Sequence, residues 1–117
     1  VDWVDDQGQH LGGHIVPGLN LLTQSLSKGT ANVKFDAQLW SNIAPGQSTD
    51  MAVYQGVLAM AVGYIDSLLR QNSQDMSMRV FITGGDALTL QKYIQNEMIW
   101  RPNLVIEGLK LYAKGEH

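Results

Sequence analysis

The long apolar stretch at residues 49–72 constrains the fold of this chain more than any other feature. Ser48, Thr49 and Asp50 offer capping side chains and first-turn charge, which predicts a helix running from here to about Asn72. Apolar residues recur along it at helical spacing: Val53, Val57, Met60 or Ala61, Ile65 and Leu68. A surface helix packs such a stripe onto the core, so the remaining elements are expected to lie along it.

A second face of the same predicted helix carries only small residues. They stand at spacings of four, three and four: Ala52, Gly56, Ala59 and Gly63. A glycine inside a helix costs roughly 1 kcal/mol relative to alanine. This cost favours the interpretation that another helix or a partner subunit comes close to this face. The alternative is that Gly56 and Gly63 are merely tolerated.

Shorter elements stand on both sides of the long helix in the sequence. Before it we predict a β-hairpin over residues 1–16, a helix from Leu19 to about Gly29 and an irregular segment at 30–48. After it we predict a loop at 71–77, strands at 79–83 and 98–100, and helices from 86 to about 95 and from 104 to 112. Strands and helices alternate in this second half, so the fold class is α/β with a mixed sheet.

Two glycine pairs interrupt these elements. In FITGGDALTL the pair Gly84-Gly85 joins a predicted strand to a predicted helix, which Asp86 is expected to cap. Glycine has no Cβ, so a planar or anionic ligand such as a nucleotide can approach the backbone there. The alternative is that the turn needs a glycine only for a positive φ. In the hairpin, Gly12-Gly13 indicates a bulge or a close approach to the backbone, beside His14.

Three polar groups are further candidates for ligand contact. The Thr49 hydroxyl would either cap the long helix or meet a polar ligand. Asp2 and Asp5 are expected to share one face of the first strand, where they would bind a cation or remain exposed carboxylates. His14 would contact a ligand or be an exposed strand residue. We find no Ser/His/Asp set, metal-ligand cluster or phosphate-binding P-loop in the sequence.

Composition narrows the class of protein. A chain of 117 residues is expected to form at most one domain. The net charge of −3, with only 8 scattered Lys and Arg residues, predicts no nucleic-acid partner. No apolar run reaches membrane length and no secretion signal is visible, so no membrane partner is expected. The chain has no cysteine, so no disulfide framework or thiolate metal site is expected. It opens with VDWVDD and without Met, which indicates the interior of a longer polypeptide.

Taken together and in order, four stretches resemble the C-terminal half of type III pantothenate kinase. They are VDWVDDQGQHLGGHIVPGL, PGQSTDMAVYQGVL, VFITGGDA and PNLVIEGL. The same family includes proteins called Bvg accessory factors. The resemblance implies a ribonuclease-H-like half of an actin-like ATPase fold, the fold of sugar kinases and heat-shock chaperones. Residues 1–117 would then be the incomplete C-terminal domain of a two-domain kinase.

The resemblance also implies an activity and a set of ligands. The family transfers the ATP γ-phosphate to pantothenate, the first step of coenzyme A biosynthesis, and needs Mg²⁺ and K⁺ or ammonium. It is cytoplasmic and forms a homodimer, here through the helix at 49–72. Thr49 matches the threonine that contacts pantothenate from the second subunit. Gly84 and Gly85 match the adenosine-side glycines. Gly12 and Gly13 match a further glycine turn on the ATP side, and Asp2 matches an acid near the metal.

Three family motifs are missing from this sequence. They are the phosphate motif Asp-x-Gly-Asn-Thr, the stretch Gly-x-Asp-Arg with the expected general base, and the motif Gly-Thr-Ala. Phosphoryl transfer depends on positioned phosphates, metal and base, so the chain alone is expected to be inactive. The missing Gly-Thr-Ala strand would leave two neighbouring strands with unpaired edges. Alternatives to a kinase domain are a regulatory module like the accessory factors and a dimerisation module without ligand.

Overall fold

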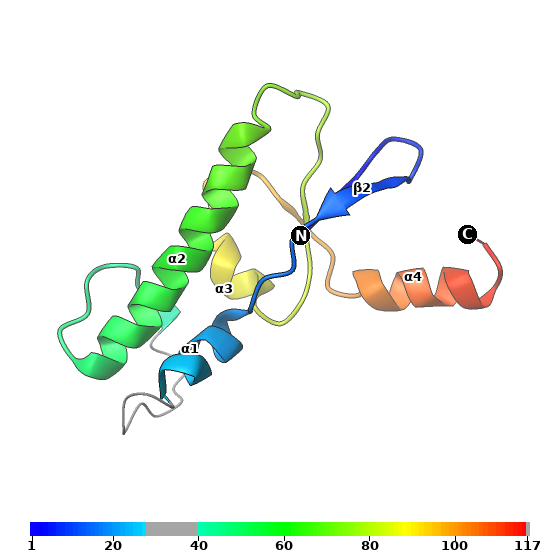
Figure 1. Cartoon of the computed structure of the whole chain (residues 1–117). Helices are drawn as coiled ribbons and strands as arrows, with labels where there is room; N and C mark the ends of the chain where they lie inside the picture. The colour runs from blue at the N-terminus through cyan, green and yellow to red at the C-terminus, as the bar shows by residue number, and fades with distance from the viewer. Residues whose placement is uncertain (28–39, 117) are drawn as a thin grey trace.

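The computed structural model describes residues 1–27 and 40–116, which form short strands and four helices, the longest of which is central (Figure 1). The elements are β1 (Asp2–Val4), β2 (His10–Gly13), α1 (Leu19–Ser27), α2 (Thr49–Gln71), β3 (Phe81–Ile82), α3 (Ala87–Gln91), β4 (Ile99–Trp100) and α4 (Leu104–Ala113). The predicted α/β class is confirmed. The predicted end of the first helix near Gly29 and most of the irregular segment lie outside the described residues.

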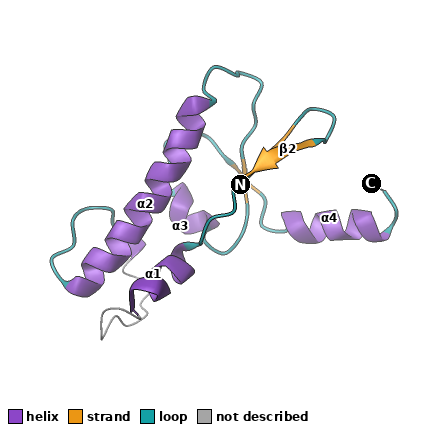
Figure 2. Cartoon of the chain, in the orientation of Figure 1, coloured by secondary structure: helices purple, strands orange, loops and turns teal. Residues whose placement is uncertain are grey.

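The strands form two separate pairs. Figure 2 distinguishes strands from helices by colour, with β2 labelled in the hairpin near the N-terminus. β1 and β2 are antiparallel, with Asp2 opposite Gly13 and an irregularity between Trp3 and Val4. β3 and β4 are parallel, with Phe81 opposite Ile99. Both orientations of a mixed sheet are therefore present, but within the described residues they do not join into one sheet. Each of the four described strands pairs on one side only, so the missing central strand stays a prediction.

The helix α2 begins where the capping pattern predicts. Ser48, in extended backbone conformation, is the N-cap, and its hydroxyl accepts a hydrogen bond from the Met51 N–H at 3.2 Å. Asp50 places a negative charge in the first turn and Arg70 a positive charge in the last, both favourable to the helix dipole. Capping and charge therefore fix both ends of this helix locally.

The buried face of α2 lies beside the predicted stripe rather than on it. Val57 is buried as expected, but Met60 is 56% exposed, and the other members of the stripe are half-buried. The buried residues of the helix are Tyr54, Gln55, Val57, Leu58, Val62 and Leu69. Leu19 from α1, with Trp40, Ile94 and Met98, completes the core around them. Several apolar stripes were available on this helix, and contacts with α1 and α3 decide which one is covered.

The small-residue face of α2 is exposed. Ala52, Gly56, Ala59 and Gly63 all face solvent. No heavy atom of the described residues lies within 4 Å of a Cβ built on Gly56 or Gly63. No described element of this chain therefore explains the glycines, and a partner on this face remains a prediction.

The last helix, α4, extends away from the other helices (Figure 1). None of its residues is buried by the described chain. Its large apolar side chains are between 36% and 69% exposed: Leu104, Val105, Ile106, Leu109, Leu111 and Tyr112. An ion pair connects Arg101, which precedes the helix, to Glu107 in its first turn.

By length and composition α2 would also pass as a membrane-spanning helix, with a mean hydropathy of 1.4. The core helix of a soluble protein passes the same test. In this structure α2 packs against α1 and α3 through its buried face, as such a core helix does. The sequence expectation that no apolar run reaches membrane length is therefore wrong for α2, while the packing of α2 favours a core helix.

Candidate functional site

The glycine turn after β3 is open to solvent. Gly84 has a φ of +101°, a conformation that side chains rarely adopt, so one glycine is needed for the turn itself. Gly85 has no such requirement. Within the described chain, no heavy atom lies within 4 Å of a Cβ built on either residue. Glycine at position 84 is therefore required by the backbone conformation of the turn, and Gly85 leaves the backbone next to it open to solvent.

The prediction that Asp86 caps the following helix is wrong. Among the described residues its side chain makes no capping bond to α3. The Asp86 Oδ2 instead accepts a hydrogen bond from the backbone N–H of Leu19, at 3.3 Å. The helix α3 is also shorter than predicted, ending at Gln91 and not near Gln95. A helix of five residues has little dipole, so the turn offers less to an anion than the sequence suggested.

This contact brings two turns together that are far apart in the sequence. A Cβ built on Gly18 would lie 3.3 Å from Asp86 Oδ2, so Gly18 allows the carboxylate to approach. Gly18 also starts α1, because its carbonyl accepts the Leu22 N–H at 3.0 Å. The Pro-Gly turn before α1 and the Gly-Gly-Asp turn before α3 therefore form one junction.

The hairpin glycines have a local structural reason. A Cβ on Gly13 would stand 2.5 Å from the Val1 carbonyl oxygen and 2.8 Å from Asp2 Oδ1, so only glycine fits against β1. Gly12 has a φ of +137° beside the irregular pairing of the two strands. The predicted bulge and close approach are both present, and the approaching group is the chain's own first strand.

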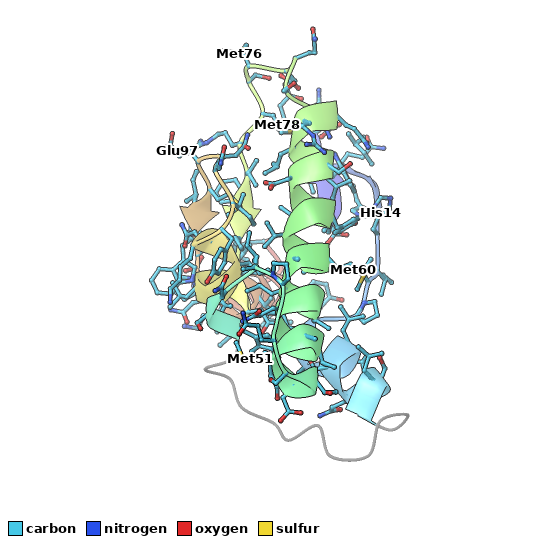
Figure 3. The ribbon with its side chains drawn as sticks, turned by 90° about the vertical axis from the view of Figure 1, so that its left-hand side faces the viewer. His14, Met51, Met60, Met76, Met78 and Glu97 are labelled. Carbon is cyan, nitrogen blue, oxygen red and sulfur yellow. The ribbon has the colours of Figure 1, made fainter. Side chains whose placement is uncertain are left out.

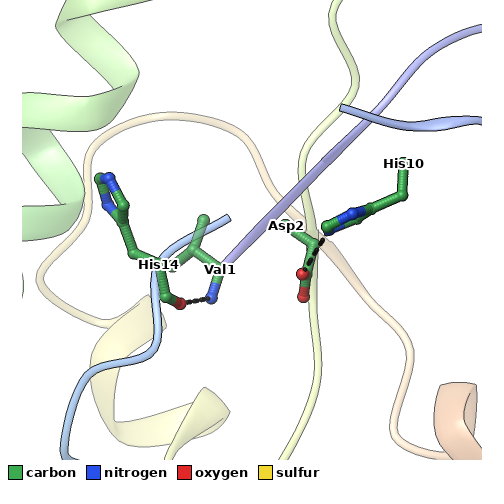
Figure 4. Close-up of polar contacts among 4 residues, drawn as sticks. All are labelled: Val1, Asp2, His10 and His14. Carbon is green, nitrogen blue, oxygen red and sulfur yellow. Dashed lines mark hydrogen bonds and ion pairs between the residues drawn. The ribbon is translucent and has the colours of Figure 1, made fainter. Parts of the chain in front are cut away.

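Asp2 lies in a shallow depression of about 370 Å³ with Gly13, His10 and His14. Its Oδ1 is 2.9 Å from His10 Nε2 (Figure 4). The prediction that Asp5 shares a strand face with Asp2 is wrong. The strand β1 ends at Val4, before Asp5, and residues three positions apart would point to opposite faces of a strand. The Asp5 carboxylate accepts the Gln7 and Gln9 N–H groups in the hairpin turn. No group of three or more metal-ligating side chains occurs among the described residues.

His14 is exposed, as its alternative interpretation expects, but it lies beyond the end of β2 and has partners. Its Nδ1 is 2.6 Å from the Tyr64 hydroxyl of α2, and its ring meets Trp3 edge-on at 5.3 Å. Figure 3 labels His14 beside α2, and Figure 4 shows its ring on the side that faces this helix. These three residues connect the hairpin to the long helix. No sequence pattern signals a contact between residues fifty positions apart.

Thr49 is the exposed first residue of α2, and the capping role belongs to its neighbour Ser48. It lies at one end of a shallow groove of about 430 Å³ between α1 and α2. The groove is lined by Leu26, Thr49, Ala52, Val53, Gly56, Val57 and Met60. The small residues hollow the helix surface here, and Thr49 supplies a hydroxyl at its margin. The groove is therefore suited to an apolar segment with one polar contact.

The predicted site residues thus occupy three places. Asp2 and Gly13 share the hairpin depression, Gly84 and Gly85 form the open turn at the junction with α1, and Thr49 lies at the groove of α2. Sequence analysis missed the Asp86 contact and the partners of His10 and His14. Within the described residues these places are separate surfaces of one small α/β domain with an exposed glycine turn after a parallel strand.

Comparison with known proteins identifies the family. The type III pantothenate kinase model matches residues 1–71. A type III pantothenate kinase of Alcanivorax borkumensis is 35% identical over 115 residues, 97% of this chain and 46% of that protein. One of Marinomonas sp. is 36% identical, over 95% of this chain and 45% of that protein. The chain therefore belongs to the type III pantothenate kinase family.

A solved structure also has this fold. It is described as a Baf family transcriptional activator from Campylobacter jejuni, with a TM-score of 0.62 and 23% sequence identity. The match covers 99% of this chain and 53% of that one. The chain therefore spans about half the length of the relatives that it matches.

Proposed function

We propose that this chain is the C-terminal domain of an ATP-dependent pantothenate kinase, a ribonuclease-H-like half of an actin-like ATPase fold. In the full protein it would help transfer the ATP γ-phosphate to pantothenate, the first step of coenzyme A biosynthesis, in the cytoplasm. The observation that carries this proposal is the family match over residues 1–71 together with relatives that are named type III pantothenate kinases. The paired but separate strands support an incomplete sheet.

The nucleotide side of the proposed site is the turn Gly84-Gly85, with Gly12 and Gly13 as a second contact. The backbone at Gly85 is uncovered, and the space that a Cβ would fill is open, so a planar ligand could lie against it. Gly13 fits less well, because β1 already occupies the space beside it. Gly84 and Gly85 are therefore the stronger candidates for contact with ATP.

The pantothenate and metal contacts are Thr49 and Asp2. Thr49 would bind pantothenate across a homodimer interface formed by residues 49–72, because it borders the groove and the exposed small-residue face of α2. Asp2 supplies one carboxylate, paired with His10, and the described residues do not complete a metal site around it. Mg²⁺ takes one or two carboxylates plus substrate phosphates, so Asp2 would hold it only together with ATP and groups outside this chain. The full protein would also need a monovalent cation, K⁺ or ammonium.

The test of this proposal joins this chain to the part of a type III pantothenate kinase that it does not cover. We expect ADP release that requires both ATP and pantothenate, and none from the 117-residue chain alone. Thr49→Val should raise the KM for pantothenate with little effect on the KM for ATP, while Ser48→Ala should act on stability. A folded, full-length protein without pantothenate-dependent turnover would exclude the kinase function.

A regulatory module is the second candidate, favoured by the structural neighbour described as a transcriptional activator. The sequence offers little for direct contact with DNA, since only 8 Lys and Arg residues are scattered over the chain. Strong DNA binding that weakens steeply with salt would favour this candidate. Binding that is weak at low salt would leave the kinase domain as the better account.

A further inference from the structure

The carboxylate of Asp86 connects two backbone turns that are 67 residues apart, and no charge of the first turn of α1 competes with it. Its Oδ2 accepts the Leu19 N–H at 3.3 Å, and Leu19 is a core residue only 2% exposed. The first N–H groups of a helix lack partners within the helix and carry positive partial charge. Asp86 therefore supplies a hydrogen-bond acceptor to the first turn of α1, although the two segments are distant in the sequence.

The backbone of Asp86 is held as firmly as its side chain. Its carbonyl oxygen accepts the Leu90 N–H at 3.0 Å, and the carbonyl of Gly84 accepts the Ala87 N–H at 3.2 Å. Ala87, next to Asp86, is 2% exposed. The turn at Gly84-Gly85 is thus anchored to the core on its C-terminal side, while its other surface is open.

We propose that Asp86 is a positioning residue for the nucleotide turn: it fixes the Gly84-Gly85 backbone against the start of α1 and does not touch the ligand. This inference rests on the proposed function, in which that turn contacts ATP. Gly18 is part of the same contact, because a Cβ built there would lie only 3.3 Å from the Asp86 carboxylate oxygen Oδ2.

The direct test is made on this chain by NMR. Asp86→Ala should speed hydrogen exchange of the Leu19 amide and shift the Gly84 and Gly85 amide resonances. Asp86→Asn should retain both, because its amide oxygen still accepts. Gly18→Ala should shift the same glycine amides. Asp75→Ala is the control, because the Asp75 carboxylate accepts hydrogen bonds from Ser77 within its own loop. Unchanged Leu19 exchange and glycine shifts in Asp86→Ala would overturn the inference.

The functional consequence is measured with a fluorescent ATP analogue. We expect Asp86→Ala to raise its Kd about three- to tenfold, with Asp86→Asn close to the unchanged chain. Val62→Ala, which removes buried atoms of α2, should lower stability without moving this Kd. An Asp86→Ala Kd equal to that of Val62→Ala would overturn the positioning role. No binding to the unchanged chain would overturn the nucleotide site in it, and the amide measurements would still decide whether Asp86 fixes the turn.

Discussion

The helices α2 and α4 are both apolar, yet α2 holds most of the core together, whereas α4 has no residue in the core that the described residues form. In α2, Tyr54 and Leu58 are 0% exposed, whereas Leu109 in α4 is 62% exposed. The helix α2 packs against α1 and α3, while α4 extends beyond the described body of the chain (Figure 1). Apolar periodicity therefore predicts that a helix has a face to bury, but it does not predict whether another segment of the same chain packs against that face.

Replacing one leucine in each helix tests this comparison most severely. Leu58→Ala should destabilise the chain by about 2–5 kcal/mol, because it empties a fully buried site. Leu109→Ala should change the free energy of unfolding by about 0.5 kcal/mol or less, because its side chain is already in water. Urea unfolding followed by circular dichroism measures both. Equal losses would show that α4 is covered in solution.

The second prediction concerns the exposed small-residue face of α2, which a partner subunit is expected to cover. Gly56→Leu should weaken a homodimer through α2 at least about tenfold, since a large side chain fills the face that a partner helix would approach. The same change should slightly stabilise the monomer, because glycine disfavours helix. Sedimentation equilibrium measures the association, with Arg70→Ala on the same helix as control. Dissociation by Leu109→Lys and not by Gly56→Leu would assign the dimer to α4 instead.

The third prediction concerns how the hairpin is attached to α2. Tyr64→Phe removes the hydroxyl that meets His14 Nδ1 at 2.6 Å and should cost about 0.5–1.5 kcal/mol. Because Trp3 lies against His14, its fluorescence should change with the same substitution. Tyr93→Phe serves as the control on a second half-buried tyrosine. A fluorescence spectrum and stability identical to the unchanged chain would mean that the hairpin is held by other contacts.

The smallest expected effect is a pH dependence in the loop that follows α2. Hydrogen bonds from the Ser77 hydroxyl and the Ser77 backbone N–H lower the pKa of Asp75 below the ordinary value of an aspartate. A lowered pKa in the folded state contributes stability above the unfolded pKa, which is lost as pH falls through the folded one. The group is fully exposed, so Asp75→Asn should remove only a slight fall in Tm between about pH 5 and pH 3. A large effect would require a partner for Asp75 beyond its own loop.

Local patterns predicted several elements because their causes lie within a few residues. The start of α2 follows from the Ser48 cap, and the glycine at position 84 follows from a positive φ in the turn. The pair Gly12-Gly13 was recognised as a bulge or close approach because glycine inside a strand is typical of one, although the approaching group is the more distant β1. The glycine turn of the candidate site could therefore be found from the sequence.

Contacts between distant segments could not be found in the same way. Sequence spacing placed the buried stripe of α2 one residue away from its true position, because several apolar rows satisfy a helical period and only packing selects one. The role of Asp86 was misassigned for a similar reason, since capping rules consider the next helix and not one 67 residues earlier. The error in placing Asp5 was one of spacing, since residues three positions apart point to opposite faces of a strand, and β1 also ends at Val4, before Asp5.

The sequence by itself determined the α/β class, the long central helix and, through its ordered motifs, membership in the type III pantothenate kinase family. These depend on capping, periodicity and short motifs, which act over a few residues. Only the tertiary structure decided which face of α2 is buried, that Asp86 joins two turns, and that α4 and the small-residue face of α2 are left uncovered. Burial depends on which surfaces meet in space, and a local pattern carries no information about the partner that covers it.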